Sequence, residues 1–335
     1  MKNQTDHKQH TIAANALHFI GMAYKHYKIV FFFIILQIVT GVILPLMGLY
    51  LPRLAVGLAM ENRGVAHVVV TLGSFAIALV LLECISGISG WGKYPFQNMM
   101  RNIYQRILFL KALDCDYNIM ENSDGQSWYH RARGHFTGGD WSVSNRMINP
   151  VQSLISGVIA FAFLTWILTT LSPLIVLLLI ALSAAGFFID GFPRRYEEKY
   201  RVQNDDIGRK LNYIEHSMSD ISAAKDMRIY NLPALITGLK EDLYHKMYRL
   251  NTRIQNRYFL AGTFNSLLTV IRDGVAYAFC IWHVLAGNIS VPEFTLFMGA
   301  IAAFSGWLKG LMDNINTLKH ANIHANEVRA FFDYS

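Results

Sequence analysis

The sequence predicts an all-α membrane protein with six transmembrane helices and long cytoplasmic extensions. Apolar stretches of roughly 20 residues or more recur six times, and each is long enough to cross ~30 Å of hydrocarbon as a helix. Only 16% of the 335 residues are charged and 53% are hydrophobic, whereas a soluble domain carries about a quarter charged residues. The polar segments between the apolar stretches keep helical periodicity, so they also are expected to be helices.

The chain begins with a polar segment, residues 1–26, which has no short apolar stretch followed by a small-residue cleavage site. We therefore do not interpret it as a signal peptide, and we expect a cytoplasmic segment with an amphipathic first turn at the inner surface. The predicted spans follow, the last of them starting at Pro292, a residue suited to the first turn of a helix. They cover residues 27–57, 65–91, 148–170, 173–192, 258–285 and 292–318, with 319–335 as a following linker.

The connections between spans alternate between short and long. If the short turns lie outside, the long polar segments 93–147 and 190–258 lie on the same side as both termini. That side then holds 27 of the 30 Lys and Arg residues. By the positive-inside rule the chain is a multi-pass protein of the cell membrane with cytoplasmic termini. This distribution also explains the formal net charge of +7 without nucleic acid, which we do not expect as a partner.

Each long polar segment is predicted to be an out-and-back helical hairpin that projects into the cytoplasm. Apolar residues recur at helical spacing among charges, at Ile103 and Ile107 in the first segment and at Ile207 and Leu211 in the second. At 1.5 Å per residue, about 25 extra residues carry a helix more than 35 Å beyond the bilayer. The predicted tips lie around ENSDGQSWYHRA and AKDMRIYNLP.

Ionisable residues inside predicted spans are candidates for a substrate path. Arg272 and Asp273 lie about midway along the fifth span, and Glu83 in the second span is a possible counter-charge for Arg272. Adjacent helical residues point about 100° apart, so we do not expect Arg272 and Asp273 to neutralise each other face to face. A buried structural ion pair is the alternative to a substrate contact.

Aromatic residues of the last span are the other candidates for the path. Phe297, Phe304 and Trp307 recur at seven and three residues and so share one helix face. They line a hydrophobic path in one interpretation and pack against other helices or lipid in the other. His320 and His324 have the i,i+4 spacing of a metal site but no third ligand in the sequence, and the three cysteines fit neither a metal site nor a disulfide framework. We predict no metal site and no catalytic residues.

Four strings, in order, carry a resemblance that covers nearly the whole chain from about residue 20. They are DYNIMENSDGQSWYHRA (116–132), SMSDISAAKDMRIYNL (217–232), AGNISVPEFTLFMGAIAAF (286–304) and ANEVRAFFDY (325–334). In this order, with six spans and two cytoplasmic hairpins, the chain resembles the transmembrane domain of an ABC exporter of the type I exporter (type IV transporter) fold. In that family the strings form the first intracellular loop, the second coupling helix, the last outer turn and the exit toward the nucleotide-binding domain.

The resemblance implies that both hairpin tips dock on nucleotide-binding domains, the second tip usually on that of the partner subunit. Apolar side chains would make the contact and charged ones would fix the orientation at a polar rim. The alternatives are an ordinary surface tip for the second hairpin and packing between the hairpin helices for the first. The implied coupling residues are Trp128, Tyr129, Lys225, Asp226, Met227, Arg228, Ile229 and Tyr230.

The motifs of ATP chemistry are missing from the sequence. It contains neither a G-x-x-x-x-G-K-[ST] loop nor an LSGGQ-like string. ATP and Mg would therefore belong to an associated nucleotide-binding domain, so enzyme activity of this chain itself stays open. Two explanations compete: a truncated fusion, which we favour because the family usually fuses the two parts, and a separately encoded permease.

The resulting hypothesis is the membrane-spanning half of an ATP-driven exporter that works by alternating access. Its partners would be the lipid bilayer, a second transmembrane half, identical or not, the nucleotide-binding domains and an amphipathic substrate. Two other readings stay open. One is an ATP-independent carrier or channel, which predicts coupling charges in several spans and internal repeats. The other is a non-transporting membrane scaffold or sensor whose hairpins bind a regulator.

Overall fold

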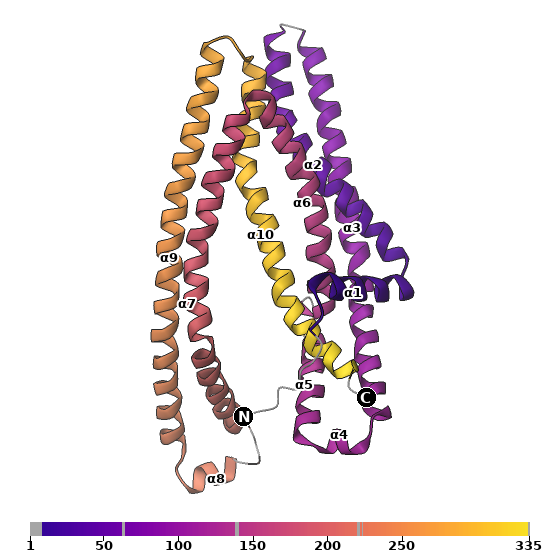
Figure 1. Cartoon of the computed structure of the whole chain (residues 1–335), viewed down its shortest axis with the longest axis vertical. Helices are drawn as coiled ribbons and strands as arrows, with labels where there is room; N and C mark the ends of the chain where they lie inside the picture. The colour runs from indigo at the N-terminus through magenta and orange to yellow at the C-terminus, as the bar shows by residue number, and fades with distance from the viewer. Residues whose placement is uncertain (1–8, 62–63, 138–140, 220–221, 223, 334–335) are drawn as a thin grey trace. The chain divides into compact units, whose positions relative to one another are not determined.

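The computed structural model describes residues 9–61, 64–137, 141–219, 222 and 224–333. All ten regular elements in this part of the chain are helices (Figure 1). They are α1 (Ile12–His26), α2 (Ile29–Met60), α3 (Val65–Asp114), α4 (Tyr117–Glu121), α5 (Ser123–Thr137), α6 (Val143–Leu171), α7 (Pro173–Ser219), α8 (Ala224–Ile229), α9 (Pro233–Leu285) and α10 (Val291–Asp333).

Six of these helices, α2, α3, α6, α7, α9 and α10, are long and apolar enough to cross a membrane, which confirms the prediction of six span-like helices. Each overlaps one predicted span, and several are much longer than that span. Helix α3 runs unbroken for 50 residues, and α9 for 53 residues. The apolar and polar parts of the sequence therefore join into single helices, as expected for spans that continue past a bilayer.

The chain separates into two compact units, residues 1–176 with 277–335 and residues 177–276. The first unit contains α1 to α6, the beginning of α7, the end of α9 and α10. Its main core forms where α1, α3, α5, α6 and α10 meet, around the fully buried rings of Phe19, Tyr104 and Phe136. The Tyr104 and Phe136 rings stack with centroids 5.0 Å apart at an angle of 6°. Aromatic packing therefore joins the polar extension of α3 to α5.

Helix α1 is amphipathic, as its predicted first turn suggested. Thr11 caps it by accepting a hydrogen bond from the Ala14 amide at 3.3 Å, and Phe19 faces the core while Leu17 and Tyr24 are exposed. Asn15 is fully buried and donates to Asn322 Oδ1 and Asn326 Oδ1 on α10, both at 2.8 Å. The N-terminal helix is thus fixed to the last helix of the chain. Its position at a membrane surface stays a prediction.

The turn from α9 to α10 is built by local sequence signals. Gly287 adopts a φ of 72° just after α9, a conformation that glycine reaches without a Cβ clash. Ser290 and Glu293 then form a capping box: the Ser290 amide donates to Glu293 Oε2 at 2.9 Å and the Glu293 amide donates to Ser290 Oγ at 3.4 Å. The capping box therefore fixes the position at which α10 begins.

The predicted linker 319–335 is a helix over its described part, and its role as a linker toward a nucleotide-binding domain stays a prediction. Helix α10 continues to Asp333, and Ala321, Ala325, Val328 and Phe331 are buried in the core of the first unit. Lys111 also donates to the Phe332 carbonyl at 2.8 Å. Apolar residues at a spacing of three and four continue the buried face of the last span, so this segment belongs to the packed domain.

The second unit is a hairpin of α7 and α9, with α8 between them at its end (Figure 1). Polar side chains connect the two long helices at intervals; we call these contacts the hairpin ladder. Its rungs are Ser183–Arg272, Asp190–Asn265, Glu197–Tyr258 and Glu215 with Lys240 and Tyr244. The predicted out-and-back form of the second polar segment is therefore confirmed.

Candidate functional site

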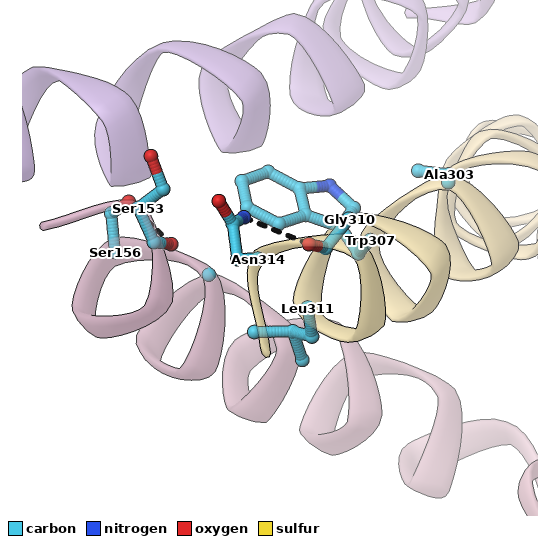
Figure 2. A pocket seen from close by; sticks show the side chains of 9 residues that line it. Ser153, Ser156, Ala303, Trp307, Gly310, Leu311 and Asn314 are labelled. Carbon is cyan, nitrogen blue, oxygen red and sulfur yellow. Dashed lines mark hydrogen bonds between the residues drawn. The ribbon is translucent and has the colours of Figure 1, made fainter. Parts of the chain in front are cut away.

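A pocket of about 450 Å³ lies between α6 and α10, within the first unit. Its volume falls in the range of small-molecule sites, roughly 300–1,000 Å³. Figure 2 shows the Trp307 indole and the Asn314 amide on the side of α10 that looks toward Ser153 and Ser156 of α6. The remaining lining residues are Gly157, Ala303, Gly306, Gly310 and Leu311.

Small residues explain why a pocket can exist between two closely packed helices. A Cβ at Gly157 would lie 2.8 Å from Leu311 Cδ2, so glycine lets the leucine side chain lie against the α6 backbone. Small residues at helix interfaces allow such close approach in membranes. Beside this contact, Gly306 and Gly310 leave open the space that Trp307 borders. The pocket is therefore a gap of glycine and alanine surface next to one large aromatic ring.

The polar groups of the pocket are few and fixed. Ser156 Oγ donates to the Ser153 carbonyl at 3.2 Å, and Asn314 Nδ2 donates to the Gly310 carbonyl at 2.8 Å (Figure 2). The Ser156 hydroxyl thus bonds to the backbone of α6, and the Asn314 amide nitrogen bonds to the backbone of α10. An apolar wall with a few oriented polar groups and one indole suits an amphipathic molecule better than a highly charged one.

Only one of the three aromatic residues predicted for the path borders this pocket. Trp307 does so, but Phe304 is fully buried with its ring centroid 4.9 Å from that of Phe161 on α6. Phe297 is also buried, with 6% of its surface exposed. Burial thus favours the alternative of helix packing for Phe297 and Phe304, and a path lined by these two residues stays a prediction.

Glu83 borders a second, wider recess on α2 and α3. This recess measures about 570 Å³ and also involves Gln37, Gly90, Trp91 and Tyr94. Gln37, which lines this recess, also accepts from Lys93: Lys93 Nζ donates to Gln37 Oε1 at 2.6 Å and to Gln152 Oε1 at 3.0 Å. Amide oxygens satisfy the ammonium without removing its charge. The sequence interpretation missed this lysine–amide cluster, although Gln37 and Gln152 are unusual residues within apolar stretches and signal an interhelical contact.

Arg272 and Asp273 pair directly, which corrects the expectation that neighbouring helical residues would not. Arg272 Nη2 lies 2.8 Å from Asp273 Oδ1, and Nε donates to the same oxygen at 2.9 Å. The long arginine side chain bends back around the helix to reach its neighbour. Arg272 is buried and also approaches Ser183 Oγ at 3.4 Å, so the buried structural pair is the supported alternative. A pairing of Arg272 with Glu83 stays a prediction.

The tip of the second hairpin carries the predicted coupling residues on its surface. No residue of α8 is buried. Lys225, Asp226 and Arg228 are exposed and Met227 is half-buried, while Ile229 and Tyr230 expose 63% and 71% of their surface. Asn231 adopts a φ of 49°, which ends the helix by a left-handed turn and presents Tyr230 at the corner.

The first hairpin places its predicted residues differently. Trp128 and Tyr129 lie on α5, are half-buried and pack against the main core, with Tyr129 5.8 Å from the Phe331 ring on α10. The structure thus favours the alternative of packing within the chain, while docking through these two residues stays a prediction. The end of this hairpin is α4 (Figure 1), where Tyr117 exposes 77% of its surface. Tyr117 is an exposed tip residue that the sequence interpretation missed.

Comparison with known proteins assigns no family: no protein-family model matches the chain, and no curated protein matches it. The chain's own features that bear on function are the pocket, the lysine–amide cluster and the hairpin tips.

Proposed function

We propose that the chain is the membrane-spanning half of an ATP-driven ABC exporter, in which the α6–α10 pocket belongs to the substrate path. The observation that carries the proposal is α8. A six-residue helix with an exposed isoleucine and tyrosine stands at the end of a hairpin whose two helices are 47 and 53 residues long. Such a tip is suited to receive motion from a soluble partner and pass it along rigid helices.

The hairpin ladder supports this role mechanically. Polar contacts at several levels, from Ser183–Arg272 to Glu215–Lys240, tie α7 to α9 over most of the second unit. Two helices tied at several levels tilt together, so a push at α8 is carried along the hairpin.

The partners follow from the surfaces. Large apolar side chains are exposed along the hairpin above its polar end, among them Phe188, Phe192, Phe264 and Val270. In the proposal they contact lipid and a second transmembrane half at the cell membrane. ATP and Mg bind the nucleotide-binding domains on which the tips dock, and both termini are cytoplasmic. The substrate is amphipathic, in keeping with the glycine-rich pocket beside Trp307.

The test uses the longest natural form of the protein, purified in lipid nanodiscs. ATPase activity, its stimulation by the amphipathic dye rhodamine 6G and dye transport in proteoliposomes are measured for Tyr230→Ala and Ile229→Ala. We expect dye-stimulated hydrolysis and transport to fall at least tenfold. Tyr248→Ala is the matched control, because Tyr248 on α9 exposes the same 71% of its surface as Tyr230 but lies away from the tip.

Two results would count against the proposal. If no ATPase is present or co-purifies and dye flux is unchanged in the variants, an ATP-independent carrier replaces the exporter. If there is neither ATPase activity nor flux, the scaffold or sensor replaces it. Equal losses in Tyr230→Ala and Tyr248→Ala would show that the effect does not come from the tip.

A further inference from the structure

Three possible metal ligands from distant parts of the sequence meet in the first unit. His135 lies in the last turn of α5, and His324 and Glu327 lie one turn apart on α10. Their nearest ligand atoms all lie within 4.8 Å of one another. Residues three apart on a helix share a face, so α10 presents both of its ligands toward α5.

The two histidine nitrogens lie at different distances from the Glu327 carboxylate. His135 Nε2 lies 2.5 Å from Glu327 Oε2, whereas His324 Nδ1 lies 3.9 Å from the same oxygen. The second distance is too long for a hydrogen bond. The two imidazole rings are 4.4 Å apart between centroids. His324 thus approaches the carboxylate without bonding to it.

His324 Nδ1 is a buried nitrogen with no hydrogen-bond partner among the described residues. A buried polar atom without a partner is costly and calls for an explanation. The polar atom given nearest to it is the Glu327 Oε2 carboxylate oxygen, at 3.9 Å. A cation between the two groups would satisfy both at once.

The chemistry of the three groups matches that of zinc. Two imidazole nitrogens and one carboxylate oxygen form a known ligand set for Zn²⁺, with a fourth position left to water. Bond lengths of about 2.0–2.2 Å place the ligand atoms of a tetrahedral site roughly 3.3 Å apart. The observed separations between the histidine nitrogens and Glu327 Oε2, 2.5 and 3.9 Å, lie on either side of that value. Small rotations of these side chains would therefore bring the ligand atoms to tetrahedral spacing.

The site is also reachable from solvent. The side chains of His135, His324 and Glu327 expose 20%, 38% and 41% of their surface. His320, which the sequence suggested as the i,i+4 partner of His324, is exposed and does not belong to the cluster. The two ligands besides His324 are His135 of α5 and Glu327 in the next turn of α10.

We propose that His135, His324 and Glu327 form a binding site for a divalent transition metal, with Zn²⁺ the best fit, that fastens α5 to the end of α10. On binding, each imidazole offers a nitrogen lone pair, and any proton shared between His135 Nε2 and Glu327 is released to solvent water. The site holds two helices together and takes no part in catalysis. It does not depend on whether the protein transports or uses ATP.

The experiment uses the 335-residue chain in detergent, purified with a tag that contains no histidine and freed of metal with EDTA. Zn²⁺ binding is measured by isothermal titration calorimetry and by the melting temperature, and Co²⁺ is used as a visible probe. We expect one metal ion per chain, a higher melting temperature with Zn²⁺, and the intense visible absorption of tetrahedral Co²⁺. His135→Gln, His324→Gln and Glu327→Gln should each weaken Zn²⁺ binding more than about tenfold.

The matched control is His320→Gln, on the same helix one turn away, which should bind Zn²⁺ as the unchanged chain does. A second variant guards against simple misfolding: His324→Cys keeps a zinc ligand and should add a sulfur-to-cobalt charge-transfer band. If the chain binds neither Zn²⁺ nor Co²⁺, or if His320→Gln weakens binding as much as His324→Gln, the proposal is overturned. Absence of the sulfur band in a folded His324→Cys that still binds Co²⁺ also overturns it.

Discussion

Asn265 donates its amide to both carboxylate oxygens of Asp190, at 3.3 and 3.2 Å, and this pair is the middle rung of an antiparallel heptad pattern. Seven residues away on each helix, Ser183 meets Arg272 on one side and Glu197 meets Tyr258 on the other. A repeat of seven keeps contacts on one seam of two packed helices. The seam of this hairpin is polar, which fixes the register of α7 against α9.

The middle rung predicts a loss of hairpin stability. Asp190→Ala leaves the Asn265 amide without its acceptor, and we expect a destabilisation of about 1 kcal/mol, the usual size for one interhelical bond in a membrane protein. The measurement is thermal unfolding in detergent. Asp205→Ala, an exposed aspartate on the same helix, should change the melting temperature little. The double variant Asp190→Ala/Asn265→Ala should lose no more than the single variant, and additive losses would contradict the contact.

We predict that position 92, where α3 packs against α2, tolerates no side chain larger than that of glycine. A Cβ at this position would lie 2.5, 2.8 and 2.9 Å from three ring atoms of Phe33. A ring cannot yield as a flexible chain end does, so Gly92→Ala should destabilise the protein by roughly 1–3 kcal/mol through overpacking. Gly73→Ala on the same helix, with nothing within 4 Å of the new Cβ, is the control for circular dichroism melting. A melting temperature equal to that of the control would refute the contact.

We predict that the Trp307 indole contributes to the affinity of the α6–α10 pocket for an amphipathic ligand. Removing the indole takes away the largest apolar surface of the pocket, so Trp307→Ala should raise the Kd for rhodamine 6G about tenfold, equivalent to ~1.4 kcal/mol. Fluorescence anisotropy of the dye measures this. Trp166→Ala removes an indole that is 66% exposed and does not border the pocket, and it should leave the Kd unchanged. An equal effect of both substitutions would place the dye elsewhere.

Glu215 predicts how the polar end of the hairpin responds to acid. Hydrogen bonds from the Tyr244 hydroxyl and the Lys240 ammonium lower the pKa of the Glu215 carboxyl. A lowered pKa stabilises the folded state at pH values above the unfolded pKa of about 4.5, and this stabilisation is lost as the pH falls through the folded pKa. We therefore expect the distance distribution between spin labels at positions 213 and 248 to be narrow at pH 7 and broad near pH 3.

The control for this acid response is Asp206→Asn, because Asp206 pairs with Lys210 of its own helix rather than with α9. It should keep the response of the unchanged chain. Glu215→Gln should already give a broader distribution at pH 7. A distribution in Glu215→Gln that is as narrow as in the unchanged chain at pH 7 would show that this carboxylate does not hold the helices.

The spans and the second hairpin were predictable because both rest on patterns that are local in sequence. The length of an apolar stretch such as 27–57 can be read directly from the sequence. The tip AKDMRIY is visible as an abrupt change of composition between two helical segments. The heptad rungs were also present, as polar residues at 183, 190 and 197 opposite 258, 265 and 272. Their pairing could not be predicted, because it depends on the antiparallel register of α7 against α9, which neither segment determines alone.

Other features depend on side-chain reach or on distant contacts. Arg272 bonds to Asp273 because a long flexible side chain overrides the direction of its Cβ. The exposure of Trp128 and Tyr129 depends on where the end of α10 passes, and its residue Phe331, which contacts Tyr129, lies 202 residues later in the sequence. His135 and Glu327 are 192 residues apart, so helical spacing alone pointed to His320 instead. Periodicity identifies faces of helices, but only the fold decides which faces meet.

The contacts of Asn15 have a consequence for the order in which the protein is made. Its partners Asn322 and Asn326 follow it by 307 and 311 residues. At ~5–20 residues per second, a ribosome needs roughly 15–60 s to synthesise the intervening chain. During that time the polar face of α1 has none of these partners, and the Asn15 amide, buried only in the finished fold, is available to water or lipid headgroups. The first helix to emerge is therefore among the last to reach its final place.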